Sequence, residues 1–316
     1  MFRFLKKNTD SSSSLKRYYL NCRGNRTGPA IFGKRLKNEF KEMGWVYNAR
    51  SFDYNLAFIS GNYCNGKVNV LRLDGLYFDI DDTVGNTDEL NIPIRKSYYE
   101  FDKIIFQSNF SKEMFFRHFG NIKKPYKVIY NGVPKYFSPI GKKYNYPFDR
   151  TIVCSSTWRA HKRLEGIIDG FKELNNSTIG LVILGKCEKI VNHKNIVYLG
   201  NVKAHNLPYY LRGADAFVHL TWLDCCPNVV VEALACGLPV LCSHNGGTKE
   251  LVRDSGIILK LEDDYNFQKV ALYSPPKPDP GIVADGMKTL LEWNKPIERA
   301  DLYIDHVSRQ YIDFIT

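Results

Sequence analysis

Apolar strand-like segments alternate with amphipathic helix-like segments in two long series along this chain of 316 residues. The first series runs from Lys16 to Val133, and the second from Thr151 to Val252. The central residues of segments such as DKIIFQS and GLVILG are apolar on both faces, which is typical of parallel strands covered by helices on each side. The alternation therefore predicts an α/β protein with two doubly wound, Rossmann-like domains that face each other across a cleft.

The two series are separated by residues 134–150, PKYFSPIGKKYNYPFDR, a stretch rich in Pro, Gly, Tyr and Lys that is typical of a linker. We therefore expect an N-terminal domain over residues 1–145 and a C-terminal domain over residues 146–299. A terminal helix over residues 300–316 is expected to rejoin the N-terminal domain. Residues 262–283 show no periodicity and are expected to be irregular.

The composition, with 44% hydrophobic and 24% charged residues, is that of an ordinary globular protein. No stretch is long and apolar enough for a membrane span. The first residues, MFRFLKKNTDSSSS, are too polar for a signal peptide and are expected to form a short leader. The eight cysteines lack zinc or redox spacings, and several lie in apolar runs, which favours a reduced, cytoplasmic compartment.

Basic charge is concentrated in the first half of the chain. Residues 1–150 hold 26 Lys and Arg against 14 Asp and Glu, whereas the remaining residues hold 18 against 19. A basic surface of this kind suits nucleic acid, an anionic membrane or an acidic acceptor, or it is simply solvated. The aromatic residues of this half fall mostly at core spacings, so we expect no nucleic-acid partner. Peripheral membrane contact through the basic half stays open.

Three cations follow the first strand of the second series in the motif WRAHKRL, namely Arg159, Lys162 and Arg163. In open parallel sheets, ligands bind beyond the carboxyl ends of the strands. Cations at a helix N-terminus oppose the helix dipole, and a bound anion removes that penalty. The motif therefore predicts a diphosphate site, although a charged helix start is the simpler alternative.

Two carboxylates, Asp224 and Glu232, are separated by seven residues across the loop and helix of DCCPNVVVEALACG. A carboxylate inside so apolar a helix accepts hydrogen bonds well from neighbouring hydroxyls of a sugar ring. Gly246 and Gly247 follow at the next strand end and leave bare backbone N–H groups for a phosphate or a hydroxyl. The combination favours a sugar-nucleotide site over a structural ion pair at Glu232.

Together these motifs resemble the nucleotide-sugar domain of retaining GT-B glycosyltransferases, in particular glycosyltransferase family 4. The resemblance covers about Lys127 to Val252, through WRAHKRL, NIVYLGNV, LPYYLRGADAFVHL, the carboxylate pair, EALACGLPVLCS and NGGTKELV. In the N-terminal half it is an outline only, where RTGPAIFGKRLKNEFKEMGW resembles the acceptor-side glycine loop and helix of the family.

The resemblance implies a nucleoside-diphosphate sugar as donor. Glu232 would bind the ribose hydroxyls, and Asp224 the hydroxyls of the transferred sugar. Arg159 and Lys162 would neutralise the leaving diphosphate. The remaining implied donor residues lie in the loops around them: Arg163, Leu199, Gly200, Asn201, Val202, Asn228, Val229, Asn245, Gly246, Gly247 and Thr248.

On the acceptor side, the resemblance implies a role for Gly28 in the glycine loop. The histidine of the family has no counterpart here, and Asp74 at the end of NVLRLDG is our candidate catalytic residue for its place. Arg72 beside it would orient the carboxylate. A turn role for Asp74 in its D-G pair is the alternative. Asp224 also stands where the family usually has Glu, so the donor sugar stays open.

The implied reaction retains configuration at the anomeric carbon and depends mainly on stabilising the leaving diphosphate. Cationic side chains and helix N-termini supply that stabilisation, so we expect no metal and no cofactor. The expected partners are a nucleotide sugar and a glycan, lipid-linked or small-molecule acceptor.

Two other activities compete with this interpretation. The motif FDIDDT contains Asp79 and Asp81 in the spacing of a metal-dependent GT-A transferase. A sugar-nucleotide 2-epimerase shares the two-domain architecture, but it needs acid and base groups, and the histidines here do not form a recognisable set. Activity in excess EDTA, or epimerisation without an acceptor, would distinguish them.

Overall fold

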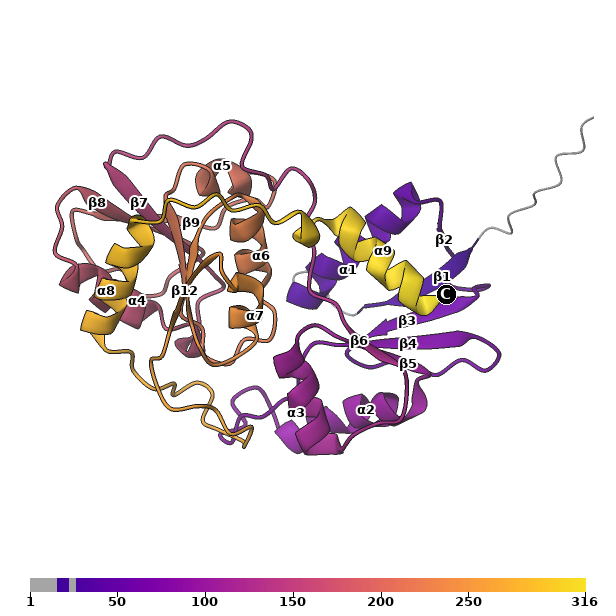
Figure 1. The fold of residues 1–316 in the computed structure, drawn as a ribbon. Helices are drawn as coiled ribbons and strands as arrows, with labels where there is room; N and C mark the ends of the chain where they lie inside the picture. The colour runs from indigo at the N-terminus through magenta and orange to yellow at the C-terminus, as the bar shows by residue number, and fades with distance from the viewer. Residues whose placement is uncertain (1–15, 23–26) are drawn as a thin grey trace, which may run out of the picture.

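A computed structural model describes residues 16–22 and 27–316 of the chain. The polar leader expected at residues 1–14 and part of the RGNRTGPA loop lie outside the described residues. The described chain forms two six-stranded parallel sheets (Figure 1). This arrangement confirms the predicted α/β class with two doubly wound units.

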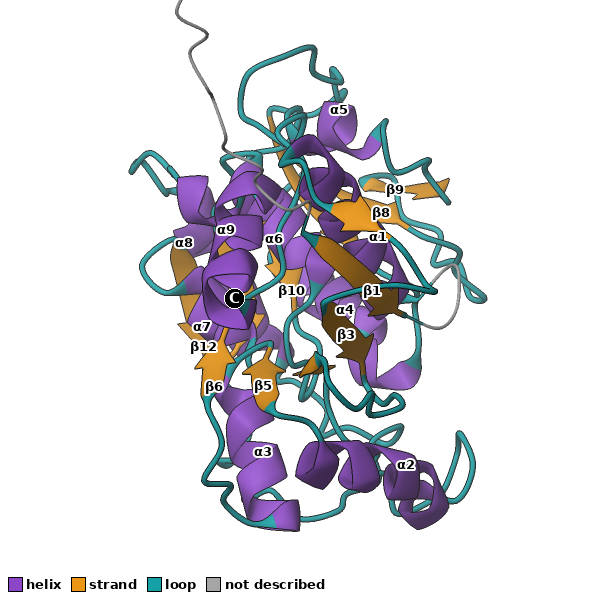
Figure 2. Ribbon diagram, turned by 90° about the vertical axis from the view of Figure 1, so that its right-hand side faces the viewer, coloured by secondary structure: helices purple, strands orange, loops and turns teal. Residues whose placement is uncertain are grey.

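The first sheet has the strand order β2-β1-β3-β4-β5-β6, and all of its pairs are parallel. Its strands are β1 Arg17–Asn21, β2 Val46–Tyr47, β3 Tyr54–Phe58, β4 Val68–Leu73, β5 Lys103–Phe106 and β6 Tyr126–Val128. Its helices are α1 Gly28–Glu42, α2 Thr87–Glu100, α3 Asn109–Phe119 and α9 Ile304–Ile315. In both views α2 and α3 lie on one side of the sheet, and α1 and α9 lie on the other (Figures 1 and 2).

The second sheet has the order β12-β11-β10-β7-β8-β9, again parallel throughout. Its strands are β7 Arg150–Ser155, β8 Ile179–Leu184, β9 Ile196–Gly200, β10 Ala216–His219, β11 Val240–Ser243 and β12 Gly256–Leu259. Its helices are α4 Leu164–Glu173, α5 Leu207–Leu211, α6 Asn228–Ala235, α7 Thr248–Val252 and α8 Pro280–Leu291, with short 3-10 turns at Ala160–Lys162 and Ala300–Leu302. Helices cover both faces here as well.

Alternation along the strands divides each sheet between two cores. In β7, Ile152 and Cys154 pack with α4 and α8, whereas Val153 between them packs with α6 and α7. In β4, Val70 faces α1 and α9, whereas Leu71 faces α2 and α3. Successive side chains of a strand point to opposite faces, so strands that are apolar throughout need helices on both sides.

The chain returns to the first sheet after α8. Helix α9 packs against α1, with Val307, Tyr311 and Ile315 in the same core as Phe32 and Leu36 (Figure 1). Gly132, on the segment between the sheets, passes close under α9, because a Cβ there would lie 3.0 Å from Val307. The two sheets are therefore joined by two crossings of the chain, near residues 129–137 and 297–304.

Most of the predicted elements appear where the sequence places them, and the differences have local causes. Helix α2 begins at Thr87, well before its buried apolar residues, because the Asn86 side chain accepts hydrogen bonds from the N–H groups of Asp88 and Glu89. The edge strand β2 has two residues, too few for periodicity to reveal, and β12 lies beyond the second predicted series, which ends at Val252. The stretch 262–283, expected to be irregular, is irregular only to residue 279, because α8 begins at Pro280, where the Asp279 side chain accepts from Ile282 N. Among the described residues, no helix is long and apolar enough to cross a membrane.

Candidate active site

The loops that hold most of the predicted donor residues lie beyond the carboxyl ends of four strands, β7, β9, β10 and β11. Lys162 follows β7, Asp224 follows β10, and Gly246 follows β11. These three strands are neighbours in the sheet, so their loops meet at one edge. Gly200 ends β9 at the far side of the same edge. Parallel topology thus brings together residues that are up to 88 positions apart in the chain, as from Arg159 to Gly247.

Lys162 and Asp224 form an ion pair at this edge. The Lys162 Nζ lies 2.7 Å from Asp224 Oδ2, and both side chains are largely buried. His219 Nε2 lies 3.8 Å from the same oxygen. Burial raises the pKa of Asp224, but the Lys162 ammonium and His219 outweigh it, so the pKa lies well below its ordinary value. Asp224 is therefore a carboxylate at neutral pH, next to a cation that a phosphate can also engage.

Arg159 and Arg163 differ from Lys162 in their surroundings. Arg159 is exposed at the start of the same turn. Arg163 is buried, with a left-handed backbone at φ 54°. Its Nη2 lies 2.8 Å from Glu262 Oε2, and its guanidinium lies 5.7 Å from the ring centroid of Trp222. Arg163 thus faces the loop after β12, while Arg159 faces solvent.

The loop after β11 needs its glycines because it passes directly against the loop that carries Asp224. Gly246 has φ +101°, and the Gly247 N–H donates to Asp224 O at 2.7 Å. A Cβ at Gly247 would lie 2.0 Å from the carbonyl oxygen of Cys225. Asn245 holds the other side of the loop through its amide group, which donates to Glu262 Oε1 at 3.0 Å.

Glu232 lies on α6 and is paired with a residue of the other sheet. Its Oε1 accepts a hydrogen bond from Arg35 Nη2 of α1, and both side chains are over 90% buried. Arg35 also donates to Gly132 O at 3.3 Å. Burial raises the pKa of Glu232, and the Arg35 guanidinium offsets part of that effect. The carboxylate therefore depends on a cation from the opposite half of the molecule.

Polar contacts at the start of α6 join the two halves as well. Asn228 Nδ2 donates to Gly28 O at 3.2 Å, and Asn228 Oδ1 accepts from Asn131 Nδ2 at 3.1 Å. Val229, the next residue, packs against the core on the α6 side of the second sheet. The predicted acceptor-side Gly28 and the predicted donor-side Asn228 are therefore direct neighbours.

Arg72 and Asp74 form an ion pair at the end of β4. Arg72 is 1% exposed, and its guanidinium lies over the rings of Phe32 and Phe58. Arg72 Nη2 also donates to Gln107 Oε1 at 3.1 Å. The next residue, Gly75, approaches Cys225, because a Cβ there would lie 3.1 Å from its sulfur. Asp74 is thus held beside the loop that carries Asp224.

Three of the implied donor residues, Gly200, Asn201 and Val202, lie together at the end of β9. Gly200, at φ +62°, accepts through its carbonyl from Gly185 N at 2.7 Å. Asn201 Oδ1 accepts from Lys186 N at 3.1 Å. Val202 packs against the core near β9 and α6. Gly200, through its carbonyl, and Asn201, through its side chain, thus join the loops after β8 and β9.

Glu250, on α7, holds the N-terminus of α3 across the interface. Its carboxylate accepts from the backbone N–H groups of Asn109 and Phe110, both at 2.7 Å, and from Tyr130 Oη at 3.1 Å. Unsatisfied N–H groups at a helix start favour a carboxylate. This contact and the Arg35–Glu232 pair carry no sequence signal, because their partners are 140 and 197 positions apart.

The two carboxylates of the acidic motif FDIDDT, Asp79 and Asp81, differ in their surroundings. Asp79 is 2% exposed, and its carboxylate accepts from Thr83 N at 2.9 Å and Leu272 N at 3.0 Å, whereas Asp81 is exposed. Across the described ranges, no group of three or more His, Cys, Asp or Glu side chains is arranged to hold a metal ion.

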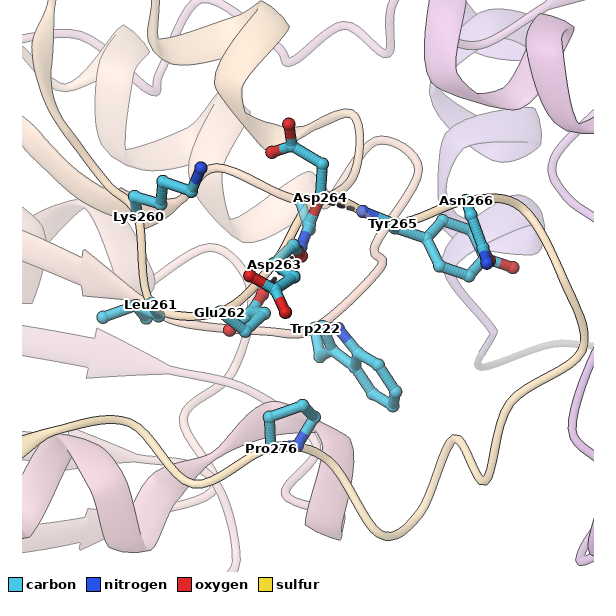
Figure 3. Close-up of a pocket in the computed structure, with 10 residues that line it drawn as sticks. Trp222, Lys260, Leu261, Glu262, Asp263, Asp264, Tyr265, Asn266 and Pro276 are labelled. Atoms are coloured by element: carbon cyan, nitrogen blue, oxygen red, sulfur yellow. Dashed lines mark hydrogen bonds between the residues drawn. The ribbon is translucent and has the colours of Figure 1, made fainter.

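A pocket of about 640 Å³ lies beside the Asn245 loop (Figure 3). Glu262 and Asp263 lie on one side of the Trp222 indole, and Pro276 lies on the other. Asn245 is the one predicted site residue that lines it. The pocket therefore borders the predicted donor site without containing its charged residues.

Two parallel six-stranded sheets with a polar interface between them define the GT-B architecture. Solved structures share this fold: sucrose-phosphate synthase from Thermosynechococcus elongatus has a TM-score of 0.66 at 12% identity, over 95% of this chain and 94% of that one. Anabaena Alr3699/HepE in complex with UDP and glucose has a TM-score of 0.59 at 14% identity, over 95% and 98%. Both likenesses concern the fold.

Residues 142–269 match the family model described as glycosyl transferases group 1. This segment, which includes the strands of the second sheet, is similar to that family, known also as glycosyltransferase family 4. The chain is 25% identical over 139 residues to O-antigen chain mannosyltransferase B of Escherichia coli, a segment that covers 40% of this chain and 36% of that protein. The family resemblance predicted from the motifs is thereby confirmed.

Proposed function

We propose that this protein is a retaining glycosyltransferase that moves a sugar from a nucleoside-diphosphate sugar to a glycan or lipid-linked acceptor. The observation that carries the proposal is the Lys162–Asp224 pair beside the Gly246–Gly247 loop, at the carboxyl edge of the second sheet. It combines a cation for a phosphate, a carboxylate for sugar hydroxyls, and a glycine loop that the Gly247 N–H holds against the Asp224 carbonyl oxygen.

In this proposal each part of the donor has its own contact. Arg159 and Lys162 bind the diphosphate, with Arg163 behind them supporting the turn. Glu232 accepts the ribose hydroxyls, and Asp224 accepts hydroxyls of the transferred sugar. The other proposed donor contacts are loop residues: Gly200, Asn201 and Val202 at the base, Asn228 and Val229 at the start of α6, and Asn245, Gly246 and Gly247 at the sugar and phosphate.

The proposed chemistry depends on charge that develops on the leaving diphosphate. When the glycosidic bond to phosphate breaks, negative charge moves onto the diphosphate, and Lys162 and Arg159 stabilise it. Before the donor binds, Lys162 is held by Asp224, so its ammonium is already oriented at the reaction centre. This arrangement accounts for transfer without a metal ion. Glycosyl transfer of this kind leaves the sugar bonded to the acceptor on the face that the diphosphate leaves.

On the acceptor side we propose that Asp74 takes the proton of the attacking hydroxyl, with Arg72 holding its carboxylate in place. Gly28 lines the approach from α1. The proposed domain boundaries are residues 1–145 with 300–316, and residues 146–299. The Escherichia coli relative is named for O-antigen synthesis, and HepE is seen with UDP and glucose. These names support a nucleoside-diphosphate sugar such as a UDP-sugar as donor and a glycan as acceptor. The basic charge of the first half is our reason for placing that half near a membrane surface.

Lys162→Ala and Glu232→Gln test the proposal. We expect the first to lower kcat by about a hundredfold or more, because one lost group that stabilises developing charge costs on the order of 10²–10³ in rate. We expect the second to weaken binding of UDP and GDP. Lys189→Ala is the matched control, since this lysine is exposed and pairs only with the exposed Glu165 within the described chain.

The assay is transfer or slow hydrolysis of UDP- and GDP-sugars, with and without EDTA. Circular dichroism and melting temperature establish that each variant is folded. Near-normal turnover by folded Lys162→Ala would show that the site has been placed wrongly. Loss of turnover in EDTA would contradict metal-independent transfer.

A further inference from the structure

Residues 263–276, here called the strap, follow β12. They cross from the second sheet to the first sheet and return to the second half at α8. In Figure 1 this orange segment runs from below β12 toward the loop that precedes α2. In Figure 1 the strap passes below the second sheet, whereas the segment that joins α8 to α9 passes above it. The strap therefore ties the two halves at a third place.

The strap pairs with the loop after β4 by backbone hydrogen bonds. Val270 N donates to Phe78 O at 3.0 Å, and Ile80 N donates to Val270 O at 3.0 Å, which forms a parallel bridge between Asp79 and Val270. The Asp79 carboxylate adds a third bond, from Leu272 N at 3.0 Å, and its second oxygen accepts from Thr83 N. Asp79 is thus the buried anchor of the strap.

Side chains on either side of the bridge reinforce it. Lys269 Nζ lies 2.6 Å from Asp88 Oδ1, and the Phe267 carbonyl lies 2.8 Å from His118 Nε2. The Phe267 ring packs 5.4 Å from the ring of Phe110. All three partners belong to the first half of the chain. The strap is therefore docked by polar and apolar contacts together.

Beyond its anchor, the strap reaches the proposed diphosphate turn. Tyr273, the residue after Leu272, lies edge-to-face with His161, with ring centroids 5.1 Å apart. Burial lowers the pKa of His161 to about 4, so the ring is neutral where it meets the tyrosine. His161 directly precedes Lys162, and its carbonyl accepts from Trp222 N at 2.8 Å. Tyr273 thus contacts the turn that carries Lys162.

We infer that Asp79 is a positioning residue, which anchors the strap so that Tyr273 holds the His161–Lys162 turn in place for the donor diphosphate. The inference rests on the proposed role of Lys162. A segment of this length without regular structure gains conformational freedom once its anchor is lost. The turn at Lys162 is a short 3-10 turn, so it depends on its neighbours for a fixed geometry.

Asp79→Ala tests this, with Asp81→Ala as the matched control in the same motif, because Asp81 is exposed. The first readout is amide hydrogen exchange, which does not depend on activity. We expect the amides of Val270 and Leu272 to exchange at least tenfold faster in Asp79→Ala and at the wild-type rate in Asp81→Ala.

The second readout is the Kd of UDP and of GDP by calorimetry, together with kcat and KM. We expect Asp79→Ala to weaken binding at least fivefold and to lower kcat, and Asp81→Ala to do neither. Tyr273→Ala serves if Asp79→Ala fails to fold: it should leave exchange at Val270 unchanged and weaken nucleotide binding similarly. Tyr273→Phe, which keeps the ring, should restore wild-type affinity.

Unchanged nucleotide affinity in a variant whose strap exchanges faster would overturn the inference and leave the proposed function intact. Unchanged affinity in Tyr273→Ala would do the same. Absence of UDP and GDP binding by the wild-type protein would instead remove the proposed function, and the inference with it. The wild-type measurement therefore separates the two failures.

Discussion

Replacing Arg35 by Met removes the cation that neutralises Glu232 and keeps most of the apolar volume of the side chain. Both members of the pair are over 90% buried at the interface between the two halves. Breaking a buried pair by removing one partner costs about 3–5 kcal/mol, because the other charge is left uncompensated. Glu232 then has one way to avoid that cost, which is to take up a proton.

The protonation cost sets the size of the effect and its pH dependence. The ordinary pKa of a Glu such as Glu232 is 4.5, and burial raises it here. Each pH unit above the ordinary value costs about 1.4 kcal/mol to keep the carboxyl neutral. The loss of stability in Arg35→Met is therefore at most about 5 kcal/mol at pH 8 and below about 1 kcal/mol at pH 5. Because the folded state holds the proton more tightly than the unfolded state, stability falls as pH rises through this window.

The loss of stability is measured by thermal unfolding at pH 5 and pH 8. Three proteins are compared: wild type, Arg35→Met, and the double variant Arg35→Met with Glu232→Gln. At about 2–4 °C per kcal/mol, Arg35→Met should melt roughly 10 °C below wild type at pH 8 and only slightly below it at pH 5. The double variant carries no charge at either position of the pair and should lose the pH dependence that Glu232 causes. An Arg35→Met protein that melts like wild type at pH 8, or whose loss is equal at both pH values, would refute the reasoning.

Two further predictions concern packing. Gly247→Ala should lower stability by about 1–3 kcal/mol and impair nucleotide binding, since the new methyl group displaces the Cys225 carbonyl. Gly28→Ala is the control and should not lower stability, because its Cβ would meet Asn228 at an ordinary 3.6 Å. Equal melting temperatures of the two variants would contradict the close approach at Gly247. In native protein at pH 8, a thiol reagent should modify Cys22, Cys64 and Cys187 before the five buried cysteines. Burial protects the five and raises the pKa of Cys242, for example, to about 12. Mass spectrometry follows the labelling, and early modification of the buried five would contradict the packing.

Local patterns predicted much of the fold. The strands β5 and β8 are visible as short apolar runs, and α6 ends before Gly237, which has φ +83° as a residue just past a helix end requires. Parallel topology then accounts for why Lys162, Asp224 and Gly246 meet, since the carboxyl ends of neighbouring strands share an edge. Their proposed roles stay predictions until the variants are measured.

Sequence periodicity reports the neighbours of a residue along its own helix or strand, and so it determined the elements, their alternation and the motif loops of this protein. Only the tertiary structure decided which side chain reaches across the interface. Arg35 meets Glu232, Glu250 meets the start of α3, and Asp79 meets the strap through contacts between residues 140 or more positions apart. Such pairs depend on how two independently patterned sheets dock, which no local pattern encodes.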